Sequence, residues 1–274
     1  MAKNRKRKND SKRLLWIILF IIVAFAVSEY NESQNRTEPD DSKLNIELAV
    51  PQFTKSTKSQ VIEHTGYTVS YNEQRRNANW VAYELTAAEV EGTEPRESKF
   101  TTDPQVIGRQ ATDDDYKHSG WDRGHLAPAA DMKWNEQVMK ESFYLSNVSP
   151  QNHNLNSGVW KSIEEFTRDI ASEHGKVLVV TGPVFTTKKG LGQIGDNRVL
   201  IPNAFFKVLL IHDGDYSAIG FYCENAAGKK KLSSYTRSID EIEEITGIDF
   251  FHLLPDDVET AVESSHNPAE WGIK

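Results

Sequence analysis

The apolar segments between residues 67 and 222 are mostly short, which limits the chain to folds rich in strands. Residues 80–85 alternate Trp80, Ala82 and Glu84 with Val81, Tyr83 and Leu85, as expected for a strand whose side chains face two sides of a sheet. Residues 176–181 are almost continuously apolar and predict a buried strand. Because strands and helices do not alternate regularly, we predict an α+β domain. Its central sheet would be mixed or antiparallel, with flanking helices.

The same patterns place the individual elements. We expect strands at residues 67–71, 80–85, 176–181, 199–201, 205–211 and 218–222. We expect helices at residues 154–175, 239–246 and 256–264. With 38% hydrophobic residues the chain has enough apolar side chains for a core, which excludes general disorder. A single cysteine, Cys223, excludes an internal disulfide and is expected to be a small buried hydrophobe.

The N-terminal segment has the features of an export signal. Residues 1–13 contain seven basic residues and one acid, and the next fourteen residues are all apolar. A bilayer span needs about 20 apolar residues, and a signal-peptide core needs about 7–15. Ala24-Phe25-Ala26 favours cleavage, whereas Trp16 and Tyr30 are placed like the interfacial aromatics of an anchor. A buried core helix is disfavoured because the run has no polar face.

Both readings predict that the protein is exported, with its basic end left in the cytoplasm. It would be membrane-anchored with its folded domain outside the cytoplasm, or secreted or periplasmic if the signal is cleaved. The predicted parts are a basic segment at 1–13, an anchor or signal at 14–30, a polar linker at 31–43, a folded domain at 44–265 and a C-terminal tail at 266–274.

The net charge of −8 is unevenly distributed. Residues 1–13 contribute +6, so the remainder carries −14, from 25 Lys and Arg against 39 Asp and Glu. Binding to nucleic acid is driven by positive side chains that neutralise phosphates. The body of the protein is therefore expected to offer only a local basic patch. The Lys229-Lys230-Lys231 run is either a solvated loop or a contributor to such a patch.

The densest group of reactive side chains is Asp122-Arg123-Gly124-His125. An acid, a guanidinium and an imidazole fall within four residues, and the glycine permits a tight backbone. A lone histidine is more often a hydrogen-bonded structural residue, but this setting makes His125 a candidate catalytic group. His64, His118 and His153 stand alone in polar stretches, and we expect them to be solvated.

Downstream, Asn156, Trp160 and Glu164 recur every four residues and would lie along one stripe of a helix. Asn156 and Glu164 would then be about 12 Å apart, too far for both to ligate one ion directly. One ligand plus one contact through water is feasible, which suits Mg²⁺ because it retains several waters. The alternatives are a helix cap for Asn156 and a solvated carboxylate for Glu164.

These residues stand in an order that resembles the ββα-metal, sugar-nonspecific DNA/RNA endonucleases, a family that includes secreted bacterial nucleases and mitochondrial endonuclease G. The similarity covers roughly residues 61–258. The matching segments are Asn79–Tyr83, Arg96 before Thr102-Asp103-Pro104, Asp122–His125, Ser146-Asn147, Pro150-Gln151, Leu155–Trp160 with Glu164, Thr181–Pro183, Asp240–Glu243 and Leu254–Asp257.

The resemblance implies a role for each matched residue. It implies that His125 is the general base and that Asn156 is the one protein ligand of the metal, Mg²⁺ or Mn²⁺. Glu164 would hold a metal-bound water. Four further residues are implied at the site, namely Arg96 and Arg123 as phosphate contacts, Asn147 as an ordering residue and Asp122 as a support for the His125 loop.

The implied activity is hydrolysis of DNA and RNA, single- or double-stranded, without sequence specificity. The ββα-metal motif would sit within the α+β domain, and no protein partner is indicated. A catalytically inactive surface protein that binds nucleic acid is the alternative, although every proposed catalytic position is filled. A zinc hydrolase or phosphatase is disfavoured because the sequence has no H-E-x-x-H motif and no pair of cysteines.

Overall fold

The computed structural model describes residues 44–228 and 230–274. The segments predicted at 1–13, 14–30 and 31–43 lie outside the described residues, as does Lys229. Within the described part of the chain, no helix has the length and apolar character needed to cross a membrane.

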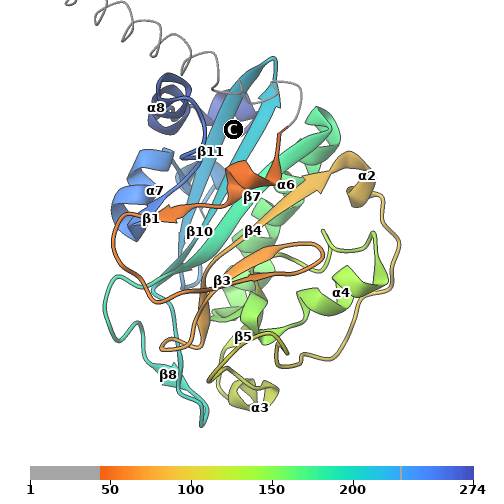
Figure 1. Ribbon diagram of the computed structural model, residues 1–274, viewed down its shortest axis with the longest axis vertical. Helices are drawn as coiled ribbons and strands as arrows, with labels where there is room; N and C mark the ends of the chain where they lie inside the picture. Colours follow the sequence, from red (N-terminus) through yellow and green to blue (C-terminus); the bar gives the residue numbers. More distant parts are fainter. Residues whose placement is uncertain (1–43, 229) are drawn as a thin grey trace, which may run out of the picture. The chain divides into compact units, whose positions relative to one another are not determined.

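A seven-stranded sheet forms the centre of the unit from Leu44 to Lys274 (Figure 1). Every neighbouring pair of strands is antiparallel. The prediction of an α+β domain with a mixed or antiparallel sheet is therefore confirmed. In spatial order the strands are β12 (Thr236–Arg237), β11 (Asp215–Glu224), β10 (Ala204–Asp213), β7 (Lys176–Val184), β4 (Asn77–Thr86), β3 (Thr68–Asn72) and β2 (Gln60–Glu63).

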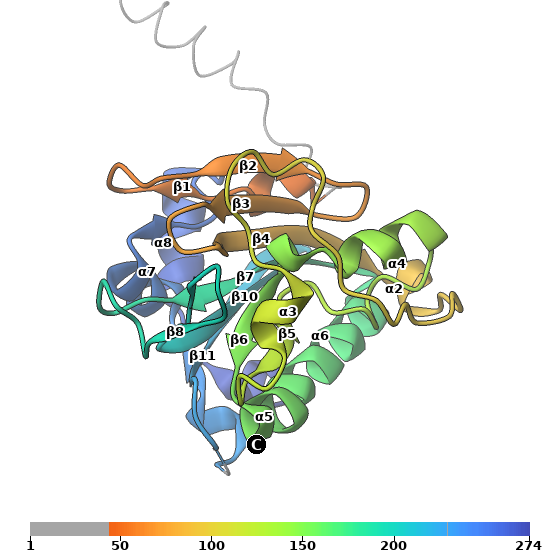
Figure 2. The same ribbon diagram turned by 90° about the horizontal axis from the view of Figure 1, so that it is seen from below.

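Helices cover both faces of this sheet (Figure 2). The long helix α6 (Lys161–His174) packs on one face, where Ile163 joins the larger core cluster. On the other face α7 (Ile239–Thr246) and α8 (Asp256–Ser264) supply Ile242 and Val262 to a second cluster. Successive residues of β10 divide between the two clusters, because side chains alternate along a strand. Phe205 contacts Trp160 at 5.5 Å between ring centroids, and Phe206 contacts Phe250 at 5.4 Å.

The chain between β4 and β7 forms a smaller layer beside the α6 face. A two-stranded antiparallel ladder pairs β5 (Asp122–His125) with β6 (Val148–Gln151). Besides α6, the helices of this segment are α2 (Ala87–Val90), α3 (Asp113–Tyr116), α4 (Glu136–Ser142) and α5 (His153–Leu155). The remaining short strands pair as β1 (Gln52–Phe53) with β13 (Ile248–Asp249) and β8 (Gln193–Ile194) with β9 (Val199–Leu200).

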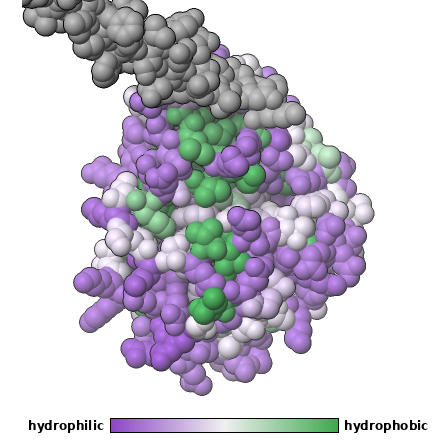
Figure 3. All heavy atoms as spheres, in the orientation of Figure 1, coloured by the Kyte–Doolittle hydropathy of each residue, from purple (hydrophilic) through white to green (hydrophobic). Residues whose placement is uncertain are grey.

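The surface in the view of Figure 3 is predominantly hydrophilic, with apolar residues gathered in several separate groups. Inside, Cys223 is fully buried and unpaired, which confirms the prediction made for it. Burial raises the pKa of this thiol to about 12, so it is not ionised at neutral pH. At the C-terminus, Ile273 is buried in the core cluster on the α6 face.

Candidate active site

The candidate site is built on two short strands followed by a helix. β5 carries Asp122, Arg123 and His125, and β6 leads into the helical segment that holds Asn156 and Glu164. Gly124 permits the close approach of the two strands. A Cβ at this position would lie only 2.6 Å from the Cβ of Gln151, so a larger residue would push β6 away.

His125 ends β5 in an aromatic enclosure. Its ring lies 5.2 Å from that of Phe100 and 4.9 Å from that of Phe143. The residue is only 8% exposed, and its Nε2 atom is buried without a hydrogen-bond partner among the described residues. Burial, assisted by the positive charge of Arg96, lowers the pKa of His125 to about 3. The imidazole is therefore neutral at physiological pH and holds a lone pair that nothing in the described fold uses.

Asn147 fixes the chain that follows His125. Its Oδ1 accepts a hydrogen bond from the amide of Ala127 at 2.9 Å. Its Nδ2 donates to the carbonyl oxygens of Ala127 and Ser142, each at 2.8 Å. The side chain is completely buried, so all three bonds are sheltered from water. Asn147 thus acts as a structural clamp behind the site.

The carboxylate of Asp122 joins β5 to the helical segment. Its Oδ2 accepts hydrogen bonds at 2.9 Å from the Nδ2 atom of Asn156 and at 2.9 Å from His153. The family resemblance implies a support for the His125 loop, but these bonds support Asn156. His153 is exposed, as expected, although it makes this contact. His64 is different, since its side chain is buried and pairs with Asp103 at 2.9 Å, so the expectation of solvation was wrong.

Asn156 begins a π-helical turn, Asn156–Trp160, that connects α5 to α6. Gly158 has φ −109° and ψ −115° within it, which kinks the segment. Because the non-helical backbone at Gly158 separates two helical pieces, Asn156 lies before the kink and Trp160 and Glu164 lie after it, so the single continuous stripe expected for these three residues was wrong. Trp160 is fully buried in the core, whereas Asn156 is only half-buried.

Glu164, on α6, lies close to a group of charged residues that includes Lys207, Asp131 and Arg168. Lys207 is completely buried in β10, 5.4 Å from the ring centroid of Trp160 and 3.4 Å from the carbonyl oxygen of Leu126. Beside it, Asp131 accepts hydrogen bonds from Arg168 and Tyr83, each at 2.8 Å. Burial raises the pKa of the Glu164 carboxyl, and the positive charge of Lys207 opposes that rise.

Lys207 was not predicted as a site residue. Its signal is present in the sequence, because it is the one charged residue in the apolar run 204–211. A lysine in such a run is rarely buried without a charged partner. The partners, Glu164 and Asp131, are 43 and 76 residues away along the chain, so only the fold identifies them.

The two arginines reach the site from different elements. The guanidinium of Arg96 lies 5.1 Å from the ring centroid of Phe143, and its charge acts on both His125 and Glu164. Arg123 points toward α3, where its Nε donates to Asp113 Oδ1 at 2.6 Å and its Nη2 to the Asp113 carbonyl at 2.9 Å. The structure therefore places Arg96 beside the candidate base and holds Arg123 against Asp113.

A divalent metal fits the donors that are present. The Nδ2 atom of Asn156 is engaged by Asp122, and its Oδ1 accepts no hydrogen bond from any described residue. An amide oxygen is a suitable ligand for Mg²⁺, which binds few protein oxygens and keeps several waters. The orientation imposed by Asp122 is the kind of outer contact that supports a metal ligand.

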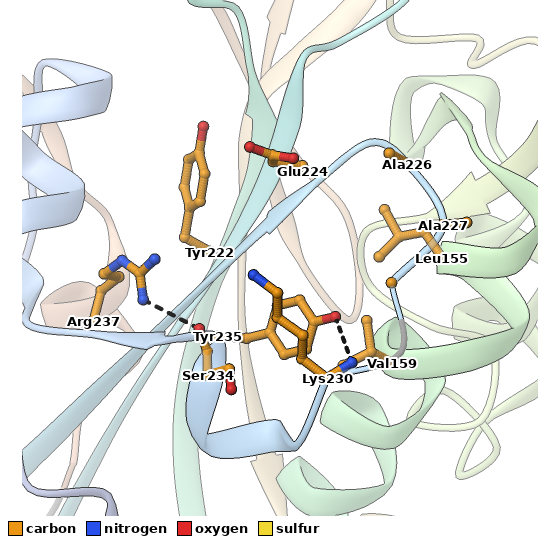
Figure 4. A pocket seen from close by; sticks show the side chains of 11 residues that line it. Leu155, Val159, Tyr222, Glu224, Ala226, Ala227, Lys230, Ser234, Tyr235 and Arg237 are labelled. Carbon is orange, nitrogen blue, oxygen red and sulfur yellow. Dashed lines mark hydrogen bonds between the residues drawn. The ribbon is translucent and has the colours of Figure 1, made fainter.

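A pocket of about 170 Å³ lies beside the same helical segment (Figure 4). Leu155 and Val159 line one side of it, and Lys230 and Arg237 come from the opposite side. The Tyr235 hydroxyl accepts a hydrogen bond from the amide of Lys230 at 3.4 Å. None of the predicted catalytic residues lines this pocket, so it neighbours the candidate site without being part of it.

Several known proteins are similar to this chain in sequence, and a solved structure is similar to it in fold. The family model described as DNA/RNA non-specific endonuclease matches residues 45–257. The chain is 32% identical over 249 residues to mitochondrial nuclease EXOG of Danio rerio, covering 85% of this chain and 71% of that protein. It is 34% identical to nuclease C1 of Cunninghamella echinulata var. echinulata, covering 72% of this chain and 85% of the relative.

Human mitochondrial endonuclease G is 33% identical over 213 residues, which cover 74% of this chain and 68% of that protein. A chain in the crystal structure of the EndoG/EndoGI complex has a TM-score of 0.69 and 26% sequence identity. That match covers 79% of this chain and 94% of the other.

Proposed function

Because this chain belongs to the DNA/RNA non-specific endonuclease family, we propose that His125 and Asn156 form the catalytic centre of a metal-dependent nuclease. The family makes the protein a hydrolase of phosphodiester bonds. The observation that carries the assignment of the base is the buried Nε2 atom of His125, which is neutral and has no partner within the described residues.

In the proposed reaction His125 removes a proton from the attacking water. The oxygen of that water forms a bond to phosphorus, and the bond from phosphorus to the 3′ oxygen breaks in line. Glu164 positions the water that gives a proton to the departing 3′ oxygen. The products are a 5′-phosphate and a 3′-hydroxyl, and the proton on His125 returns to solvent.

The other residues hold the phosphate and the metal ligand. Asp122 keeps the Asn156 amide turned so that its oxygen is available to Mg²⁺ or Mn²⁺. The bound ion would supply Lewis-acid stabilisation of the charge on the phosphoryl group. Arg96 adds fixed positive charge near His125, and Arg123 would exchange Asp113 for a phosphate oxygen. Asn147 keeps the backbone after His125 in place.

We propose that substrate selection depends on the phosphate backbone. Arg96, Arg123 and a metal on Asn156 would all contact phosphate, and contacts of this kind carry no base information. DNA and RNA, single- or double-stranded, are therefore the proposed substrates. The relatives endonuclease G and nuclease EXOG are named as nucleases, which supports nucleic acid as the proposed substrate of this chain.

The assignment is tested by digesting plasmid DNA and RNA with and without a chelator. His125→Ala should reduce the rate by several orders of magnitude in a folded protein, because the water is no longer deprotonated. His118→Asn is a matched control, since His118 is exposed and has a φ of 58° that asparagine tolerates. A His125→Ala protein that cuts at the wild-type rate would exclude the assignment. Binding without cleavage by the wild type would instead support an inactive capture protein.

We also propose that residues 14–30 direct export, either as an uncleaved anchor or as a signal removed after Ala26. The support is the basic cluster at 1–13 directly before the apolar run. A reporter fused after Lys274 should be active outside the cytoplasm, and fractionation should separate the two forms. A reporter active only in the cytoplasm would refute export.

A further inference from the structure

The sheet face opposite α6 carries a concentration of negative charge. Residues 238–264, which include α7 and α8, contain nine acids and neither lysine nor arginine. These two helices lie side by side in Figure 1. Their apolar side chains join the core cluster on that face, whereas Trp160 and Ile163 belong to the cluster on the α6 face. The acidic helices and the candidate catalytic centre are therefore on opposite sides of the sheet.

Three of these acids converge on one point. One side-chain oxygen each of Asp240, Glu243 and Glu263 lies within 4.8 Å of the other two. Asp240 and Glu243 are one turn apart on α7, and Glu263 is on the last turn of α8. Glu263 is only 7% exposed, and its Oε1 atom is buried without a hydrogen-bond partner among the described residues. A buried carboxylate without a partner is costly to maintain.

Nothing in the described part of the chain neutralises this group. None of its ion pairs involves Asp240, Glu243 or Glu263, and the one hydrogen bond to the cluster runs from the Phe250 amide to Glu243 at 2.6 Å. The neighbouring charges that act on Glu263 are also acids, Glu259 and Asp249 among them. Burial and this repulsion raise the pKa of Glu263 to about 8 and that of Glu243 to about 7.

We propose that Asp240, Glu243 and Glu263 form a binding site for a hard divalent cation, Ca²⁺, that links α7 to α8. Ca²⁺ binds carboxylate oxygens at about 2.3–2.6 Å, so oxygens on opposite sides of the ion are about 4.6–5.2 Å apart and adjacent ones are closer. The observed limit of 4.8 Å accommodates this geometry with little movement. Mg²⁺ demands a stricter octahedron and gives up its waters reluctantly, so a set of three carboxylates suits it less well.

The bound ion would stabilise the packing of α7 on α8. It replaces repulsion between carboxylates on two helices by attraction to a shared charge, and it acts only on the folded state, where the three groups meet. The site is separate from Asn156, which is on the other face of the sheet. Its occupancy should therefore change stability and leave the chemical step unaffected.

The test measures the Tm of chelator-stripped full-length protein during titration with CaCl₂. Asn156→Ala serves as the background, because it removes the proposed ligand of the catalytic metal. At a hundredfold excess over Kd, Ca²⁺ should raise the Tm of this protein by about 5–10 °C. Adding Glu263→Gln should abolish the rise, and so should Asp240→Asn, an exposed position that does not threaten folding. Glu244→Gln, on the exposed side of the same helix, should leave it intact.

Two further readouts complete the design. Without Ca²⁺, Glu263→Gln should be at least as stable as its parent, because a neutral amide replaces a carboxyl whose ionisation is unfavourable at this position. Glu263→Gln in the otherwise wild-type protein should cut DNA at the wild-type rate. The proposal is overturned if Ca²⁺ gives no rise in Tm, or if the rise persists in both Glu263→Gln and Asp240→Asn. Stabilisation by acid alone, without a response to Ca²⁺, would show that protons rather than a cation neutralise the cluster.

Discussion

The neutrality of His125 is produced by its surroundings. Phe100 and Phe143 remove water from the ring, and the positive charge of Arg96 adds to the cost of protonation. A buried imidazole such as this one accepts a proton only when a nearby negative charge offsets the free-energy cost of protonating it. The dianionic transition state of phosphodiester hydrolysis, beside the ring, would do so.

At the residue scale this predicts a dependence of stability on pH. The folded pKa of His125 is about 3, below the value of about 6.5 expected in an unfolded chain. Between these values the unfolded state binds a proton that the folded state excludes, so stability falls as pH decreases from 6.5 toward 3. The loss approaches about 1.4 kcal/mol per pH unit. Urea unfolding at several pH values should show this slope in the wild type and a shallower one in His125→Gln. Equal slopes would contradict the buried, neutral imidazole.

Lys207 leads to a second prediction at this scale. Its charge opposes the burial that raises the pKa of Glu164, so Lys207→Met should raise that pKa further. In the proposed reaction Glu164 must be ionised to position water. At a pH below the pKa of Glu164, its ionised fraction falls about tenfold for each unit by which the pH is lowered. The acid limb of the pH–rate profile should therefore move to higher pH, with activity partly recovered near about pH 9. A uniform loss at all pH values would indicate a structural role only.

At the scale of elements, the large helices and central strands could be predicted from periodicity. The helices at 239–246 and 256–264 occur with the expected bounds: Ser238 and Gly247 mark the ends of the first, and the second begins directly after Pro255. Periodicity did not predict the strands β5 and β6, although the family resemblance implied a ββα-metal motif. They are four residues each, and β6 contains Pro150, which is unusual in a strand. Their pairing depends on the close approach allowed by Gly124, a property of the contact and not of either segment.

Some parts of the candidate site could likewise be predicted from the sequence, and others could not. The motif from Asp122 to His125 contains the proposed base, and the sequence also offered Asn156 as the proposed metal ligand. The bond between Asp122 and Asn156 spans 34 residues, and the π turn at 156–160 leaves no periodic signal. The place of Lys207 in the site could not be predicted, because a strand pattern does not indicate which charged residues, distant in sequence, lie close to its side chain.

The clamp formed by Asn147 gives a prediction for the β5–β6 element. Asn147→Ala removes three buried hydrogen bonds to Ala127 and Ser142. At about 1 kcal/mol each, with backbone groups left unsatisfied, the loss in stability should be about 3–5 kcal/mol. Asn147→Asp keeps the acceptor for the Ala127 amide but turns its second oxygen toward the carbonyl oxygens of Ala127 and Ser142, so the ionised form should lose at least as much stability as Asn147→Ala. Denaturant unfolding measures both, and a loss below about 1 kcal/mol for Asn147→Ala would contradict the clamp.

At the scale of the whole molecule, charge decides how nucleic acid approaches. Outside residues 1–13 the chain carries −14, and nine acids lie in residues 238–264, on helices of the sheet face opposite α6. We therefore expect a polyanion to be repelled from that face and to approach the one that carries Arg96 and His125, so that repulsion and attraction together would orient the substrate.

This arrangement predicts that binding depends only weakly on salt. Each phosphate neutralised on duplex DNA contributes a slope of about −0.9 to the plot of log affinity against log salt concentration. With two to four contacts the slope should lie between about −2 and −4. The measurement is fluorescence anisotropy with the inactive His125→Ala protein over a range of salt concentrations. Arg96→Ala in that background should make the slope shallower by about 0.9, because one phosphate contact is lost.

The matched control for that slope is Lys55→Ala. Lys55 is exposed next to Thr54, whose hydroxyl donates to the Gly247 carbonyl at 3.0 Å at the end of α7, so it belongs to the acidic side of the molecule. Its removal should leave the slope unchanged, because nucleic acid does not reach that side. If the slope stays at the wild-type value in Arg96→Ala and becomes shallower in Lys55→Ala, nucleic acid binds on the side of Lys55, and the proposed binding surface is wrong. A slope steeper than about −7, equivalent to eight contacts, would show that the chain binds through a broad basic surface instead of a local patch.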